Sequence, residues 1–312
     1  MKSYFLSVCF LVFSHFTFAQ EKVSPEQEIS IDKFTDGTLV FPENTEKAPL
    51  VIFIQGSGPT NRDGNQPMMK NDGMKKMAHE LAENGIASFR YDKRIFKMEK
   101  LRIREADLSF EDFVTDVNSI VDHFTKENKY EKIIIAGHSE GSLIGILAAQ
   151  KGEVDALISL AGPGRSIDEI IVEQLAKQSA ELSENARIAL DEIKAKGSTQ
   201  NYSPYLESIF RASVQPYMKS WMQFDPAKEL AKLEIPVLLV NGNYDLQVDV
   251  VDAELLQQAS PDSKLVILDK MNHIFRKIEG ESLENTKAYN EPNRPLHPEL
   301  IPAMVDFIKS IE

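Results

Sequence analysis

A serine flanked by glycines stands where the sequence changes character. The pattern Gly-x-Ser-x-Gly at 137–141 follows the apolar run 133–136 and precedes a segment of helical character at 142–150. Glycines on both sides of a serine permit a sharp turn from strand to helix, which exposes the hydroxyl at the carboxyl edge of a sheet and at a helix N-terminus. The pattern predicts that Ser139 is a nucleophile, the alternative being a structural glycine-rich turn.

A serine hydroxyl needs a base to take its proton, and the base needs an acid to orient it. When the serine follows a strand of a parallel sheet, the acid and then the histidine come later in the chain. His273 lies just after the last apolar run, 265–268, so we expect it to be the base. His297 approaches the final helix and is expected to be a packing or surface residue. Asp245 is the only carboxylate in the loop after the run 236–240, and we assign it as the acid.

Acyl transfer by such a serine forms an oxyanion, which two backbone N–H groups must stabilise. One is expected to belong to Glu140, the residue after the nucleophile. The other should come from the loop Gln-Gly-Ser-Gly-Pro at 55–59, directly after the apolar run 50–54, and we assign it to Ser57. A phosphate-binding glycine loop is the alternative for 55–59, but no Lys-Ser/Thr pair or Gly-x-Gly-x-x-Gly pattern follows.

Strand-like and helix-like segments alternate along the chain, which predicts an α/β fold with a mostly parallel central sheet flanked by helices. The first two strands enclose Asp36-Gly37, a pair typical of a hairpin turn. We expect strands at 28–31, 38–41, 50–54, 86–91, 133–136, 156–160, 236–240 and 265–268, and helices at 73–83, 110–124, 142–150 and 301–311.

Residues 165–233 break this alternation, because they have helical character throughout and contain no strand-like run. We interpret them as a helical cap insertion between the two parts of one core, 20–164 and 234–312. Such an excursion leaves from the carboxyl edge of the sheet, the edge that carries Ser139. Aromatic residues at helical spacing are more often core than pocket. The candidate substrate-binding residues of the insertion are Phe210, Tyr217 and Trp221.

Composition excludes several classes of function. The chain has 312 residues, 42% hydrophobic and 27% charged, which suits a single globular domain with an insertion. A net charge of −13 argues against binding to nucleic acid or anionic lipid. Residues 93–104 form a local basic stretch, which we expect to be a solvated loop.

The first residues have the pattern of a secretory signal. Lys2 precedes the apolar run 4–18, and a small-x-small pattern ends at Ala19. The run is shorter than the roughly 20 residues that span a bilayer. We therefore expect a signal peptide at 1–19, a secreted or periplasmic mature protein, and no membrane insertion of the mature chain. Cys9, the only cysteine, lies in this segment, so the mature chain can be neither a disulfide scaffold nor a thiol enzyme.

Together these segments resemble bacterial α/β-hydrolases of the serine aminopeptidase-like and esterase group. The resemblance covers about residues 48–312 without most of the insertion. It implies the α/β-hydrolase fold, hydrolysis of carboxylic esters, a helical cap, and no metal or organic cofactor. In one departure, Ile95 stands where the group usually has glycine, which puts one wall of the substrate site in question. The motifs that carry the resemblance are 55–64, 90–94, 137–141, 241–248 and 271–273.

The resulting prediction is a serine hydrolase that cleaves small-molecule esters of small to medium acyl groups through an acyl-enzyme intermediate. The first alternative is a serine peptidase of the same fold. It would need an acidic anchor for a free amine, and Glu140 is the only obvious candidate. The second alternative is a non-catalytic binding protein, against which the complete set of serine, histidine and aspartate argues.

Overall fold

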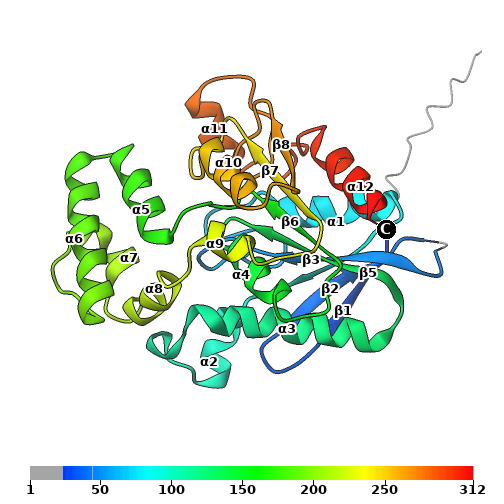
Figure 1. The fold of residues 1–312 in the computed structure, drawn as a ribbon, viewed down its shortest axis with the longest axis horizontal. Coiled ribbons are helices and arrows are strands. Elements are labelled where there is room, and N and C mark those ends of the chain that lie inside the picture. Colours follow the sequence, from blue (N-terminus) through cyan, green and yellow to red (C-terminus); the bar gives the residue numbers. More distant parts are fainter. Residues whose placement is uncertain (1–23, 44, 312) are drawn as a thin grey trace, which may run out of the picture.

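The computed structural model describes residues 24–43 and 45–311 and contains one sheet of eight strands, in the order β1-β2-β4-β3-β5-β6-β7-β8 (Figure 1). β1 pairs with β2, and β2 with β4, in antiparallel fashion, while all other pairs are parallel. The predicted mostly parallel sheet is confirmed. The strands are β1 (Glu26–Ser30), β2 (Asp36–Val40), β3 (Ala48–Ile54), β4 (Ala87–Tyr91), β5 (Tyr130–His138), β6 (Ala156–Leu160), β7 (Val237–Gly242) and β8 (Lys264–Leu268).

Each face of the sheet carries its own apolar core. On β3, Leu50, Ile52 and Ile54 pack on one face, and Val51 and Phe53 pack on the other. A strand covered on both sides must be apolar at successive positions, which explains its unbroken run of large side chains. Helices α3 and α4 cover the first face, and α1 and α12 cover the second (Figure 1). The helices outside the insertion are α1 (Gly73–Glu83), α2 (Met98–Leu101), α3 (Phe110–Glu127), α4 (Glu140–Ala149), α10 (Val250–Ala259), α11 (Ser282–Ala288) and α12 (Leu300–Ser310), with 3₁₀ turns at Arg94–Lys97 and Glu105–Asp107.

The first hairpin differs from the expectation. Asp36 and Gly37 belong to β2 itself, and the chain turns earlier, around Asp32. The carboxylate of Asp32 accepts the N–H groups of Phe34 and Thr35 at 2.8 and 2.9 Å, which closes the turn without a glycine. Gly37 is needed for a different reason, because a Cβ there would lie 2.2 Å from the ring of Phe89.

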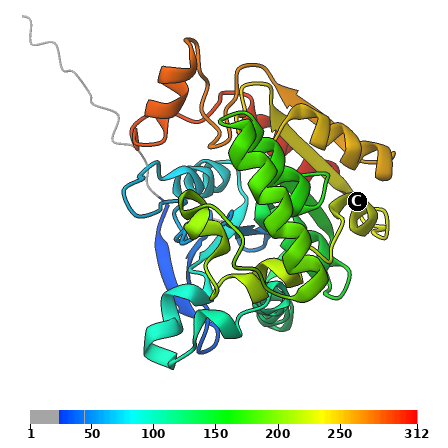
Figure 2. The same cartoon turned by 90° about the vertical axis from the view of Figure 1, so that its left-hand side faces the viewer.

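The chain between β6 and β7 contains only helices and turns. In Figure 2 this insertion faces the viewer, in front of the core. α5 packs on α6, and α8 packs on α3, whereas α9 lies against α4 and α10 of the core. No helix in 24–43 or 45–311 is long and apolar enough to cross a bilayer. The helices of the insertion are α5 (Ile167–Ala176), α6 (Ala180–Lys196), α7 (Glu207–Phe210), α8 (Gln215–Trp221) and α9 (Pro226–Leu230), with a 3₁₀ turn at Pro204–Leu206.

Candidate active site

Ser139 occupies the sharp turn between β5 and α4 that its flanking glycines predict. Its φ is 53° and its ψ −119°, a conformation that side chains rarely adopt. A Cβ on Gly137 would lie 2.1 Å from the carbonyl oxygen of Gly141, and a Cβ on Gly141 would lie 2.4 Å from that of Ile54. Both glycines are therefore required for the turn. The Ser139 N–H donates to the carbonyl of Leu160 at 2.9 Å, which ties the turn to β6.

Asp245 and His273 meet at the same edge of the sheet, in the loops that follow β7 and β8. His273 Nδ1 lies 2.7 Å from Asp245 Oδ2, and both side chains are almost fully buried. The other oxygen of Asp245 accepts the N–H groups of Gln247 and Val248 at 2.8 and 3.0 Å. A carboxylate held in this way accepts a hydrogen bond from Nδ1–H, which leaves Nε2 of His273 as the nitrogen that can take a proton.

Ser139 and His273 line one cavity, although no hydrogen bond joins them in the described part of the chain. Catalytic hydrogen bonds are often long before substrate binds and tighten in the complex. His297, which the sequence leads us to expect as a packing or surface residue, is buried. Its Nε2 lies 2.9 Å from the carbonyl oxygen of Asp269. It lines neither of the cavities that adjoin Ser139.

The loop after β3 approaches Ser139 closely. A Cβ on Gly56 would lie 3.3 Å from Ser139 Cβ, so a side chain there would crowd Ser139. Within the residues described, the backbone N–H groups of Ser57 and Glu140 have no hydrogen-bond acceptor. Both residues line the larger cavity beside Ser139. Two unused donors at this place are what an oxyanion would require.

A buried ion pair between Lys93 and Glu140 contacts the loop after β3. Lys93 Nζ lies 3.0 Å from Glu140 Oε2, and both side chains are 3% exposed. Lys93 also donates to the carbonyl oxygen of Gly56 at 2.7 Å. That carbonyl and the Ser57 N–H belong to the same peptide group. Lys93 thus holds the plane of the peptide that contains the unused Ser57 N–H.

The expectation that 93–104 is a solvated loop is wrong at its start. Lys93 is buried as described, and Arg94 is buried in a bidentate ion pair with Asp116, at 2.8 and 2.7 Å. Both lie directly after β4, where the chain passes beneath the insertion. Their partners come from α3 and α4, and no local charge pattern indicates such pairing.

Two further contacts at the site were not predicted. The hydroxyl of Tyr217, on α8, donates to Glu140 Oε1 at 2.7 Å, and burial together with that carboxylate keeps the pKa of Tyr217 well above its ordinary value. His138 Nε2 lies 2.9 Å from the carbonyl oxygen of His273. Burial, and then the neighbouring His273, hold the pKa of His138 well below its ordinary value, so its ring is neutral. The only sequence signal for His138 is its place beside Ser139.

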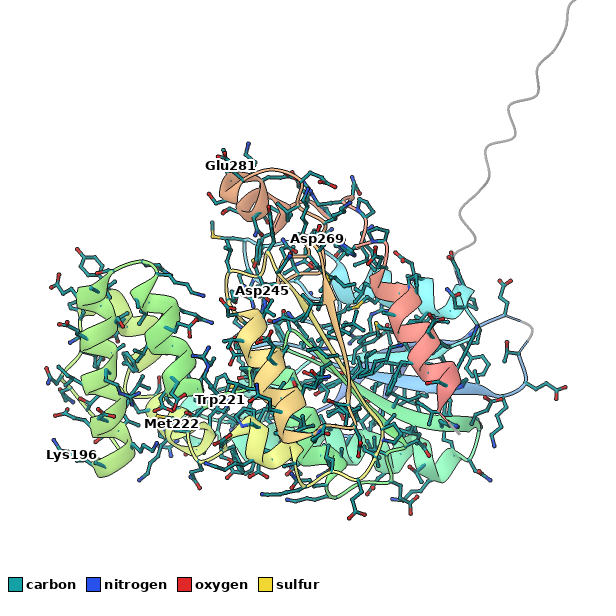
Figure 3. The ribbon with its side chains drawn as sticks, turned by 45° about the horizontal axis from the view of Figure 1, so that its top comes forward. Lys196, Trp221, Met222, Asp245, Asp269 and Glu281 are labelled. Carbon is teal, nitrogen blue, oxygen red and sulfur yellow. The ribbon has the colours of Figure 1, made fainter. Side chains whose placement is uncertain are left out.

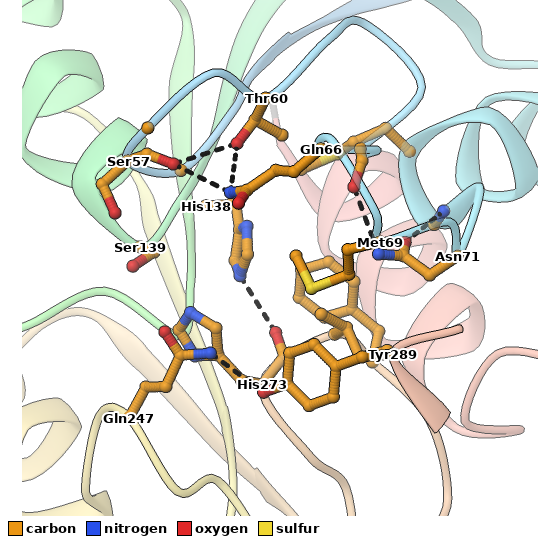
Figure 4. Close-up of a pocket in the computed structure, with 17 residues that line it drawn as sticks. Ser57, Thr60, Gln66, Met69, Asn71, His138, Ser139, Gln247, His273 and Tyr289 are labelled. Carbon is orange, nitrogen blue, oxygen red and sulfur yellow. Dashed lines mark hydrogen bonds between the residues drawn. The ribbon is translucent and has the colours of Figure 1, made fainter. Parts of the chain in front are cut away.

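Two cavities adjoin Ser139. The smaller, of about 280 Å³, contains His273 and has a wall of mixed polar and apolar side chains (Figure 4). The larger, of about 600 Å³, lies between the insertion and the carboxyl ends of β5, β6 and β7. Both are lined by Ser57, Gly58, Ser139 and Gln247.

The predicted substrate-binding residues divide. Tyr217 and Trp221 line the larger cavity, and Trp221 lies where the insertion meets the core (Figure 3). Phe210 does not, and that prediction is wrong. Its side chain is fully buried at the end of α7, beside the ring of Tyr202, and it fills the interior of the insertion instead. Ile95, the departure noted above, is part of the wall of the larger cavity.

Comparison with known proteins agrees with this geometry. Residues 71–276, more than half of the chain, match the family model described as serine aminopeptidase, S33. Esterase EstD of Thermotoga maritima is 28% identical over 262 residues, which are 82% of this chain and 61% of that protein. The chain thus spans less than two thirds of the length of this relative.

Solved structures share the fold at low identity. Est1E of Butyrivibrio proteoclasticus has a TM-score of 0.58 and 20% identity, over 92% of this chain and 100% of that one. The acylaminoacyl peptidase of Pyrococcus horikoshii has a TM-score of 0.51 and 20% identity, over 86% of this chain and 40% of that one. With the family match, the strand order and the turn at Ser139, the chain belongs to the serine aminopeptidase S33 family and has the α/β-hydrolase fold.

Proposed function

We propose that this protein is a serine hydrolase of carboxylic esters, with Ser139, His273 and Asp245 as its catalytic triad. The observation that carries the proposal is the 2.7 Å contact between His273 and Asp245, beside a serine held in a strained turn that lines the same cavity. Such an orienting pair has no role in a protein that only binds, which favours an enzyme over a binding protein.

The reaction then runs in two steps. His273 Nε2 takes the proton of Ser139 as Oγ attacks the ester carbonyl, and Asp245 stabilises the charged imidazole. The N–H groups of Ser57 and Glu140 stabilise the oxyanion. The alcohol leaves with the proton from His273. Water then attacks the acyl carbon as His273 takes its proton, and the acid leaves as His273 returns that proton to Ser139 Oγ.

An ester fits the cavities better than a substrate with a free amine. The smaller cavity has no carboxylate among the described residues that line it. The larger has Glu140, paired with Lys93, and Glu105, which is hydrogen-bonded to Arg211 and Ser213. A free α-amine would have to displace one of these partners. Glu140, the candidate amine anchor named in the sequence analysis, already has its charge paired with that of Lys93. The relative named an esterase supports the same choice.

The proposal is tested by covalent labelling and by hydrolysis. An organophosphonate should label the wild type and not Ser139→Ala, and turnover of aryl esters should fall by several orders of magnitude in that variant. His273→Ala should cost about as much, because triad members act as a unit, whereas His297→Ala should cost little. Persistent labelling of Ser139→Ala would contradict the assignment of Ser139 as the nucleophile. Faster cleavage of aminoacyl-anilides than of esters would favour the peptidase.

We also propose that the helices from 165 to 233 form a cap over the site and that residues 1–19 direct export. The cap is supported by the larger cavity, whose wall contains side chains of α5, α7 and α8 as well as Ser139. The export signal lies outside the described residues, and its support is the sequence pattern. N-terminal sequencing of protein recovered outside the cytoplasm should begin at Gln20, and an intact Met1 would contradict export by cleavage.

A further inference from the structure

We propose that the two cavities divide the substrate, so that the acyl group occupies the larger cavity and the alcohol occupies the smaller one. The substrate class is then an ester of a bulky apolar acid with a short alcohol that bears further hydroxyl groups. This inference rests on the proposed function, and it adds the orientation and chemical nature of the ester.

The orientation follows from which cavity contains the general acid. In the tetrahedral intermediate, the carbon carries Ser139 Oγ, the oxyanion, the leaving oxygen and the acyl group. The leaving oxygen must take its proton from His273, which lines the smaller cavity and not the larger. The oxyanion points to the N–H groups of Ser57 and Glu140. The acyl group is left with the remaining direction, into the larger cavity.

The larger cavity suits an apolar acyl group. At about 600 Å³ it lies well within the size range of small-molecule sites. Both of its carboxylates are paired, so they attract no further polar group. An acetyl group would leave most of it empty, and a larger apolar group would gain by leaving water. Its wall is formed mainly by aliphatic and aromatic side chains, among them Ile95, Ile170, Ile209, Val214, Met218 and Trp221.

The smaller cavity instead offers unused hydrogen-bonding capacity. His138 Nε2 donates to the carbonyl of His273, so Nδ1 of the neutral ring is an acceptor, and no described residue donates to it. The hydroxyl of Tyr289 accepts from Gln247 Nε2 at 2.9 Å and keeps its own proton to donate. Burial raises the pKa of Tyr289, which keeps that proton in place.

One acceptor and one donor in the cavity that contains His273 match hydroxyl groups on the alcohol (Figure 4). Thr60 and Gln66 also line this cavity, and Gln66 Nε2 donates to the hydroxyl of Thr60 at 2.7 Å, which fixes both side chains. A simple alkyl alcohol would bury these groups without partners, which is unfavourable.

The test is a set of four esters that combine two acids with two alcohols. The acids are acetic and 3-phenylpropanoic acid, and the alcohols are 1-butanol and glycerol esterified at one end. Wild-type kcat/KM should be higher for the phenylpropanoate by about tenfold or more, from burial of the ring. It should be higher for the glyceryl ester by about fivefold per hydrogen bond gained.

Two variants assign each preference to its cavity. Ile209→Trp, on α7, should fill part of the larger cavity and reduce the preference for the large acid, with the alcohol preference unchanged. Tyr289→Phe should reduce the preference for the glyceryl ester by about fivefold, with the acid preference unchanged. The quantity compared is the ratio of the kcat/KM values of two esters measured on the same variant. A general loss of folded enzyme lowers both values equally and leaves this ratio unchanged.

The outcomes separate this inference from the proposed function. If Ile209→Trp altered the alcohol preference and Tyr289→Phe the acid preference, the orientation would be reversed and the inference wrong. Hydrolysis of all four esters at similar kcat/KM would overturn the inference and leave the esterase standing. If no ester were cleaved and no phosphonate labelled Ser139, the proposed function would fail and this inference with it.

Discussion

Lys93 tests whether the peptide between Gly56 and Ser57 supplies an oxyanion donor. Replacing Lys93 with Met keeps the length of the side chain and removes the donor that holds the Gly56 carbonyl at 2.7 Å. Loss of a whole oxyanion donor costs about 10²–10³ in kcat, and loss of its orientation should cost less, about 10–10² or roughly 1.4–2.7 kcal/mol. Because the oxyanion develops in the transition state and the tetrahedral intermediate and is absent from the bound ester, kcat should fall while KM stays nearly constant.

The control for this prediction must separate orientation from stability. Lys93→Met leaves Glu140 as a buried charge without its ion-pair partner, which alone costs about 3–5 kcal/mol of unfolding free energy. The double variant Lys93→Met/Glu140→Gln removes that charge and retains an acceptor for the hydroxyl of Tyr217. It should recover stability in urea unfolding but keep the low kcat, measured per active site titrated with phosphonate. Recovery of kcat together with stability would refute the reasoning.

Three further predictions concern stability. Gly141→Ala should prevent folding of the turn at Ser139, because its Cβ would lie 2.4 Å from the carbonyl oxygen of Ile54. Gly85→Ala is the control, because it has open space around it and a φ of +81°, and it should cost about 1 kcal/mol in urea unfolding. Arg94→Leu should cost about 3–5 kcal/mol, because it leaves Asp116 buried without its partner; a change under 1 kcal/mol would contradict this. His138, whose pKa is lowered by burial and by its neighbour, contributes stability that is complete above pH 6.5 and lost as pH falls below it, because only the unfolded chain then takes up the proton. From pH 6.5 to 5.5 the wild type should therefore lose up to about 1.0 kcal/mol more than His138→Asn, and parallel pH profiles would contradict that origin.

The sequence predicts the parts of the site that depend on local pattern and chain order. The turn at Ser139 requires glycines because backbone atoms approach within 2.1–2.4 Å of their missing Cβ positions, and that constraint is visible in a single motif. Asp245 and His273 follow the last two strands, so their meeting at one edge of the sheet follows from parallel topology. These positions could be derived without any knowledge of side-chain packing.

The remaining parts depend on contacts between distant segments. Lys93 looks like one charge in a basic stretch, and only the packing of the segment after β4 against α4 makes it a buried partner of Glu140. Phe210 and Trp221 are both aromatic residues in short helices, yet Phe210 fills the interior of the insertion while Trp221 lines the cavity. Helical spacing specifies an apolar face and not the element against which that face packs.

The contacts of Glu140 join elements that the sequence treats separately. Its backbone N–H has no acceptor among the described residues and follows Ser139 directly, and its carboxylate receives Lys93 from the core and Tyr217 from the insertion. Lys93 continues the connection to the Gly56 carbonyl, and so to the second unused N–H. A movement of α8 would therefore either break the hydrogen bond from Tyr217 to Glu140 or shift Glu140, the residue after Ser139. Because buried polar networks are costly when only partly satisfied, the insertion and both N–H groups should hold their arrangement together or lose it together.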